Sequence, residues 1–161
     1  MSRRRNVEKS IVEEVKGNIM DTNKGLVLDV SYNDFILGAN IDRYLDRDHS
    51  KTRISFGETE PDREDYYFIQ EQIGVNCELD GTIAAIDCST TCIYQGMELI
   101  GMYFTDFLEL IHETPDSESI EYILVDGKGQ NQHVYDFDFG KSGIQVWTWR
   151  KRIRAVIIYT Y

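Results

Sequence analysis

The sequence predicts an α+β protein in which two similar helix–hairpin repeats form a largely antiparallel sheet, preceded by an N-terminal helix. Three observations predict this class: an internal match at constant spacing, a hairpin signature at Asp80-Gly81, and an amphipathic stretch at residues 6–16. The chain has 161 residues, of which 42% are hydrophobic, and this is enough apolar material for one core. We therefore expect a single domain over residues 1–161.

The internal match joins two segments that lie 63 residues apart. Residues 35–45 align with residues 98–108, and Gly38 coincides with Gly101. After each glycine, apolar residues recur at positions i, i+3 and i+4, a spacing that is typical of an amphipathic helix. We therefore predict a glycine hinge and a helix in each half, and we expect the second helix to continue through Ile111.

Each half then ends in a predicted β-hairpin. Within residues 74–86, two alternating runs flank Asp80-Gly81, a dipeptide typical of two-residue hairpin turns. The corresponding hairpin of the second half lies within residues 143–159. We therefore place repeat one at about residues 26–88 and repeat two at about residues 91–160.

Two further elements complete the prediction. The stretch 6–16 carries an apolar stripe, with Asn6 placed as its N-cap and Gly17 placed to end it. The last strand, residues 152–159, is apolar on both faces. Such a strand is expected at the centre of a sheet, with both faces covered.

The charge is strongly acidic and unevenly distributed. The chain carries 28 Asp and Glu against 17 Lys and Arg, a net charge of −11, and residues 21–149 hold 25 acidic against 8 basic residues. Binding to nucleic acid requires a basic surface, so the charge argues against a nucleic-acid ligand. An acidic face favours a basic protein partner, because opposite charges steer association.

The sequence also bears on location. Its longest apolar runs, such as Ala155–Tyr159, are far shorter than the roughly 20 residues of a membrane-spanning helix. The first eight residues lack the apolar stretch of a signal peptide, and three cysteines without a framework spacing fit a reducing compartment. We therefore expect a cytoplasmic protein without a membrane partner.

Two acidic segments stand at equivalent points of the two predicted repeats. Each follows a predicted helix and contains one of the two prolines. If the repeats pack side by side, both segments would line one side of the molecule and could bind a partner; the alternative is that each is a solvated loop. The candidate contact residues are Glu58, Glu60, Asp62, Glu64, Asp65, Asp116, Glu118 and Glu121.

A second function class, a small metal-dependent enzyme, would use Asp136, Asp138 and His133. Two carboxylates on one strand face can act as acid and base or hold a divalent cation, but His133 should point to the opposite face. The alternative is an outward polar face on a half-buried strand. The cysteines lack the paired spacing of a zinc site, and Cys77 is expected in the core. We therefore predict no catalytic residue, no metal site and no cofactor.

A third function class is an acidic homo-oligomeric structural module. Trp147 and Trp149 share one face of a predicted strand. Aromatic residues of this kind either pack in the core under the N-terminal helix or form an exposed anchor. Copies of the chain would pair through this face or through an edge strand, and the sequence leaves the oligomeric state open.

The two glycine hinges, Leu37-Gly38-Ala39-Asn40-Ile41 and Ile100-Gly101-Met102, are each followed by a hairpin, and Tyr94-Gln95-Gly96 leads into the second. This pattern, over about residues 34–160, resembles a group of bacterial immunity proteins from contact-dependent growth-inhibition and polymorphic-toxin loci. The resemblance implies a small acidic cytoplasmic protein that binds and neutralises a cognate toxin domain and has no catalysis of its own. Many such toxins are nucleases with basic clefts, so the resemblance implies a basic partner, most simply a nuclease.

Overall fold

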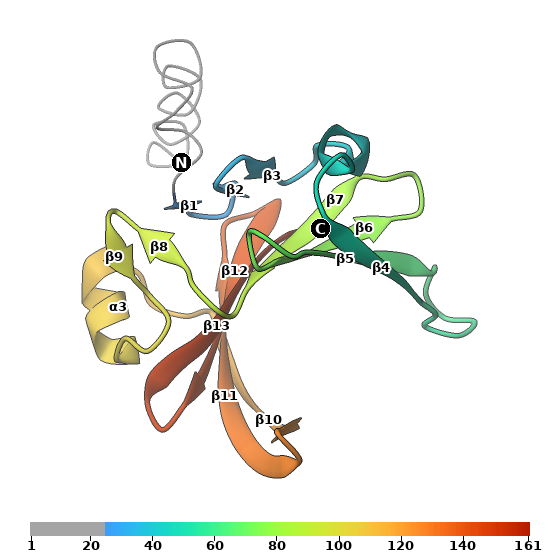
Figure 1. The fold of residues 1–161 in the computed structure, drawn as a ribbon. Helices are drawn as coiled ribbons and strands as arrows, with labels where there is room; N and C mark the ends of the chain where they lie inside the picture. Colours follow the sequence, from blue (N-terminus) through green and yellow to red (C-terminus); the bar gives the residue numbers. More distant parts are fainter. Residues whose placement is uncertain (1–24) are drawn as a thin grey trace, which may run out of the picture.

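The computed structural model describes residues 25–161, so the predicted helix at residues 6–16 lies outside the described residues. Figure 1 shows one large twisted sheet, with β10 and β11 at the bottom of the view and β4 and β5 at the right. In chain order the elements are β1 (Leu26–Val27), β2 (Ser31–Tyr32), β3 (Phe35–Ile36), η1 (Ile41–Tyr44), β4 (His49–Ile54), β5 (Arg63–Phe68), β6 (Ile73–Glu78), β7 (Ile83–Cys88), β8 (Ile93–Tyr94), β9 (Met97–Glu98), α3 (Phe104–Ile111), β10 (Ser117–Val125), β11 (Lys128–Asp138), β12 (Ser142–Trp149) and β13 (Arg152–Thr160).

The described part of the chain is mostly β, so the predicted α+β class with helix–hairpin repeats is wrong. Strands make up 54% and helical residues 9% of residues 25–161, in which α3 is the only α-helix. The second predicted helix does form, and α3 extends through Ile111 as predicted. The first is only the 3-10 turn η1, because its apolar stripe covers a single turn and an isolated turn does not sustain an α-helix.

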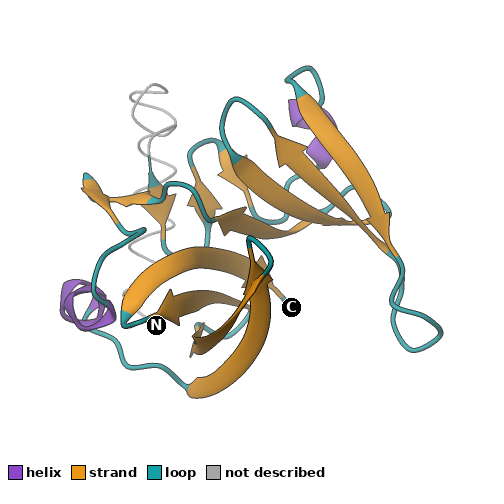
Figure 2. Ribbon diagram, turned by 60° about the horizontal axis from the view of Figure 1, so that its bottom comes forward, coloured by secondary structure: helices purple, strands orange, loops and turns teal. Residues whose placement is uncertain are grey.

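The sheet consists of two four-stranded antiparallel meanders, β4–β7 and β10–β13. They join through their last strands, in the order β10-β11-β12-β13-β7-β6-β5-β4. The central position predicted for the last strand is confirmed, because β13 lies between β12 and β7. Figure 2 shows that the meander beside α3 curls strongly, whereas the meander beside η1 is more open. Strands β10 and β4 are left as the two edges.

The two meanders carry the same irregularity. In each, the register shifts between the last two strands, which leaves Ala84 unpaired in β7 and Arg154 unpaired in β13. The bulge in β13 changes which side chains share a face. Ile153, Val156 and Ile158 are all buried on the core side, so the strand does not alternate as its sequence pattern indicates.

The turn at Asp80-Gly81 is a three-residue loop rather than the predicted two-residue turn. The backbone N–H of Glu78 donates to Thr82 O at 2.9 Å, which closes the loop around residues 79–81. Gly81 has a φ of +92° and its N–H donates to Glu78 O at 2.9 Å. A type I turn followed by a glycine with positive φ is the usual three-residue hairpin loop.

Equivalent hydrogen bonds tie each glycine hinge to its meander. The N–H of Gly38 donates to Ile83 O at 2.9 Å, and the N–H of Gly101 donates to Ile153 O at 2.8 Å. Both glycines have a positive φ, +84° and +89°, which other residues rarely adopt. Each hinge therefore anchors the segment before its meander to the start of that meander's last strand.

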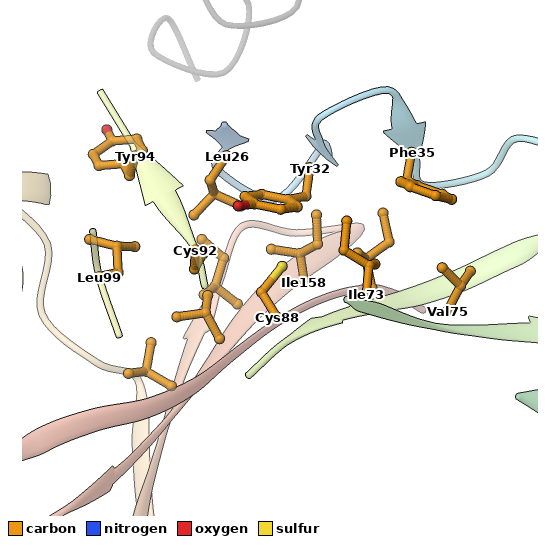
Figure 3. Close-up of a cluster of buried hydrophobic side chains, with 14 of the residues drawn as sticks. Leu26, Tyr32, Phe35, Ile73, Val75, Cys88, Cys92, Tyr94, Leu99 and Ile158 are labelled. Carbon is orange, nitrogen blue, oxygen red and sulfur yellow. The ribbon is translucent and has the colours of Figure 1, made fainter. Parts of the chain in front are cut away.

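The core lies on one face of the sheet, under the short hairpins β1–β3 and β8–β9 and the helix α3. Figure 3 shows Leu26 and Tyr32 of this covering layer above Cys88 and Ile158 of the sheet, with Tyr94 to one side. A second part of the same core lies under α3, whose buried residues are Phe104, Phe107 and Ile111. The opposite face of the sheet carries no covering layer among the described residues.

Candidate functional site

The eight predicted contact residues fall into two groups at opposite edges of the sheet. The meanders join through their last strands, so their first strands are farthest apart. The structure therefore does not bring the two acidic segments to one side of the molecule. In and around β5 lie Glu58, Glu60, Asp62, Glu64 and Asp65, and in and around β10 lie Asp116, Glu118 and Glu121.

Within the β5 group, basic residues of the neighbouring strand neutralise part of the charge. Asp62 Oδ2 lies 3.1 Å from Arg53 Nη2, and Glu64 Oε2 lies 3.1 Å from Lys51 Nζ. The hydrogen bond from Lys51 lowers the pKa of the Glu64 carboxyl. The two glutamates at the tip of the β4–β5 loop are exposed and form no ion pair with a described residue.

A pocket of about 400 Å³ lies over β4–β7 on the sheet face opposite the core. Its lining includes Asp65, Asn76 and Asp87. Asn76 Nδ2 donates to Asp65 Oδ1 at 2.5 Å, whereas Asp87 Oδ1 is buried and has no hydrogen-bond partner among the described residues. Burial, followed by the charge of Asp65, raises the pKa of Asp87 to about 6.

This pocket pairs an aspartate of raised pKa with a second carboxyl group, an arrangement suited to acid–base work. Sequence reasoning missed it because Asp65 and Asp87 lie on β5 and β7, two strands that β6 separates. The signal was a lone aspartate in the apolar run Ile83–Cys88. No histidine or cysteine lines the pocket, and no three potential metal ligands converge anywhere in residues 25–161.

The three residues of the alternative enzyme site do not converge. His133 Nδ1 lies 3.1 Å from Glu118 Oε1 on the core-facing side of β11. Asp136 lies on the opposite side, where Gln145 Nε2 donates to its Oδ1 at 3.1 Å. Asp138 follows Asp136 on that side and accepts from a neighbouring backbone N–H. The pair of carboxylates is thus a hydrogen-bonded part of an outward polar face.

The tryptophans lie half-buried on the face opposite the core. Trp147 Nε1 donates to Gln145 Oε1 at 2.7 Å. The ring of Trp149 lies between two cations, with Arg150 Cζ at 4.3 Å and Arg154 Cζ at 5.0 Å from its centroid. Both tryptophan side chains therefore contact residues of their own hairpin. The N-terminal helix that was expected to cover them lies outside the described residues.

The cysteines are buried and unlinked. The core position predicted for Cys77 is confirmed, and burial raises the pKa of its thiol to about 12. Cys88 and Cys92 contact each other in the core, and their contact and burial raise the pKa of the Cys88 thiol. Because a thiol must ionise to react, none of this favours a nucleophilic role.

The outer edge strand β10 exposes a row of apolar side chains. Ile120, Tyr122 and Leu124, called the apolar row below, are 59%, 68% and 69% exposed. Ile120 pairs with His133, which places the row on the core-facing side of the sheet. On that side the exposed row extends the apolar surface of the sheet beyond Tyr135. The ring of Tyr135 stacks on Phe104 of α3, with ring centroids 3.9 Å apart.

The apolar row is part of an ordered strand and is rimmed by carboxylates. Tyr122 lies across Gly129 of β11, where an added Cβ would fall 2.0 Å from the tyrosine oxygen. Glu118 and Glu121 belong to the same strand, and Asp126 begins the turn that follows it. Exposed apolar surface with a polar rim is typical of a protein interaction site.

None of the described helices has the length and apolar composition needed to cross a membrane. No protein-family model, curated protein or solved structure matches the chain.

Proposed function

We propose that this chain is a cytoplasmic immunity protein that binds and neutralises a cognate toxin domain, a basic protein and most simply a nuclease. The observation that carries the proposal is the edge of β10, where the exposed apolar row lies beside Glu118 and Glu121. Apolar side chains supply most of the binding energy at protein interfaces, and charged rims supply specificity and speed of association.

The acidic charge suits a nuclease partner. A nuclease cleft is basic because it must bind phosphates, and an inhibitor needs carboxylates at matching positions. Close charge pairs across one measured interface of this kind couple by about 1.5–7 kcal/mol. Such an inhibitor needs no catalytic geometry, only a rigid scaffold, and a continuous eight-stranded sheet provides one.

A single interface reaches only one of the two acidic groups. Neighbouring strands lie ~4.8 Å apart, so the two edges of the eight-stranded sheet are separated by roughly 34 Å measured along the sheet. A standard interface covers about 800 Å² per partner, or roughly 28 Å across. We therefore assign the contact to the group of Asp116, Glu118 and Glu121, which lies beside the apolar row, and not to the group around β5.

The test is protection from the toxin encoded beside this chain. The proposal predicts a large secreted protein encoded immediately upstream, and its C-terminal domain is expressed in a sensitive host with and without the chain. We expect growth only when the chain is present, and a one-to-one complex of the purified proteins. Absence of such a gene, or toxicity that the chain does not relieve, would contradict the proposal.

A second measurement locates the acidic contact. Neutralising the β10 group (Asp116→Asn, Glu118→Gln, Glu121→Gln) should slow association with the toxin domain about 10-fold at low salt and flatten its salt dependence. The control variant Glu58→Gln, Glu60→Gln, Asp62→Asn has the same net charge and should associate nearly as fast as the unaltered chain. Equal slowing of both variants would contradict the assignment to β10.

A further inference from the structure

We infer that β10 binds its partner by strand addition, so that a β-strand of a basic protein extends the eight-stranded sheet by one strand. The inference rests on the proposed function and specifies how the partner is held. It follows from the backbone of β10, from the contrast with the other edge strand and from the charge of the chain.

The backbone of β10 offers hydrogen-bonding groups on its outer side. The β10–β11 hairpin closes with a two-residue turn, Asp126-Gly127, between the paired residues Val125 and Lys128. Such a turn closes on a hydrogen-bonded pair, and alternate residues then point their N–H and C=O groups away from the neighbouring strand. In β10 these alternate residues are those of the apolar row, and no described strand lies on the outer side of β10 to accept these groups.

The opposite edge strand, β4, carries charged side chains that disfavour pairing with a further strand. The strand registers place Lys51 and Arg53 of β4 where β10 has Glu118 and Ile120. Both basic side chains of β4 form ion pairs on the core-facing side, each at 3.1 Å. Charged side chains, lysine above all, protect an edge strand against pairing with another strand. The nine residues of β10 include no lysine or arginine.

Charge selects a basic partner over a second copy of the chain. The net charge is −11, and β10 itself carries Glu118 and Glu121. An antiparallel pair of two β10 strands centred on Tyr122 would set Glu118 against Asp126 of the other copy, and like charges directly opposite are destabilising. A strand that alternates apolar and basic residues would instead place its apolar side chains beside the apolar row and its cations on the other face, near Glu121.

The experiment uses the full chain and a synthetic ten-residue peptide that alternates valine with lysine. Valines opposite the apolar row would direct their own N–H groups toward β10, whereas the lysine N–H groups would face solvent. We expect the peptide to bind and to slow hydrogen exchange at Ile120, Tyr122 and Leu124. N-methylation of the valine amides should weaken binding at least 10-fold, and N-methylation of the lysine amides should change it less than 2-fold.

Variants of the chain provide a second, independent measurement. Ile120→Lys with Leu124→Lys gives β10 a charged edge like that of β4, and we expect at least 10-fold weaker binding of the unmodified peptide. Both positions are exposed, so the fold should be retained, as circular dichroism can check. The control Ser50→Lys with Thr52→Lys adds the same charge to β4 and should change binding less than 3-fold.

Three outcomes would overturn the inference, and a fourth would bear on the proposed function only. Equal binding of the two N-methylated peptides would refute strand addition but leave an acidic contact, and with it the proposed function, in place. No binding of the unmodified peptide at low salt would also refute it. Dimerisation of the chain that Ile120→Lys abolishes would identify a second copy as the occupant instead. Failure of toxin protection, with peptide binding intact, would refute the proposed function alone.

Discussion

The meanders β4–β7 and β10–β13 have the same backbone plan and differ in their exposed residues, most clearly at the two edge strands. Phe68 and Phe137 occupy equivalent buried positions, next to Tyr66 and Tyr135. The two meanders differ in the charge of their edge strands β4 and β10 and in the conformation of their last turns. They also differ where β7 meets β13, because Asp87 of one strand is equivalent to Ile157 of the other. The comparison teaches that buried residues determine the shape of a meander, while exposed residues determine what each half can bind.

The largest expected effect tests the shared core. Phe68→Ala and Phe137→Ala each remove a fully buried ring, and each should lower the free energy of unfolding by about 3–5 kcal/mol. Because the meanders form one sheet, urea denaturation followed by circular dichroism should show a single transition for both variants. Two separate transitions would show that the halves unfold independently and would contradict a shared core.

The next effect tests the junction, where Asp87 of β7 pairs with its structural equivalent, Ile157 of β13. Burial raises the pKa of Asp87 to about 6, above the value near 4 of an unfolded aspartate. The folded state therefore binds the proton more tightly, and the stability of the protein falls as pH rises from about 4 through 6.

Asp87→Asn should remove this fall and raise the free energy of unfolding at pH 8 by about 2 kcal/mol, with little gain at pH 4. Urea denaturation across this pH range measures both values. The control Ile157→Asn, which places the same amide on the other side of the junction, should destabilise the protein at every pH. Parallel pH profiles for Asp87→Asn and the unaltered chain would contradict the assignment.

A smaller effect distinguishes the two last turns. Gly81 has a φ of +92°, and an added Cβ would lie 2.9 Å from Asn40 Oδ1, so Gly81→Ala should cost about 1–2 kcal/mol. Lys151 has a φ of +69°, a left-handed conformation unfavourable for lysine, so Lys151→Gly should stabilise the protein by about 1 kcal/mol. Chemical denaturation should therefore give opposite signs, and equal signs would refute the difference in strain.

The smallest effect tests the caps of η1 and α3. Asn40 Oδ1 accepts a hydrogen bond from the N–H of Asp42 at 2.9 Å, whereas Tyr103 caps α3 without a side-chain hydrogen bond. Asn40→Ala should therefore cost about 1 kcal/mol. Tyr103→Ala should cost less, because it loses only an exposed contact with Arg152. Equal melting temperatures for Asn40→Ala and the unaltered chain would contradict a role for the cap.

Sequence patterns predicted the buried elements better than the exposed ones. The central position of β13 and the extension of α3 through Ile111 follow from apolar spacing, which burial imposes on a strand or helix. Strand β4 gives no such signal, because its residues are charged or polar and largely exposed. Strand β10 likewise begins with polar residues, Ser117-Glu118-Ser119, which give no apolar signal. Two short apolar stripes therefore favoured an α+β fold.

The candidate site was only partly predictable for a related reason. Glu118 and Glu121 could be selected as acidic residues, but the apolar row beside them becomes notable only when the structure shows it exposed. Asp65 and Asp87 line the same pocket only because of the order of the strands in the sheet, and no local sequence pattern contains that order. Whether two acidic segments share a side of the molecule is likewise set by topology, and the topology separates them.

The junction of β7 with β13 has a consequence for how the two ends of the sheet can specialise. Because Asp87 pairs with its own equivalent, an approximate twofold axis passes between the strands. Two identical chains arranged about such an axis would necessarily present identical borders, both adhesive or both inert. A single polypeptide that supplies both halves is not bound by this symmetry, because the two edge strands can differ in sequence. One edge can therefore disfavour strand pairing while the other binds a partner, and copies of the chain do not polymerise edge to edge.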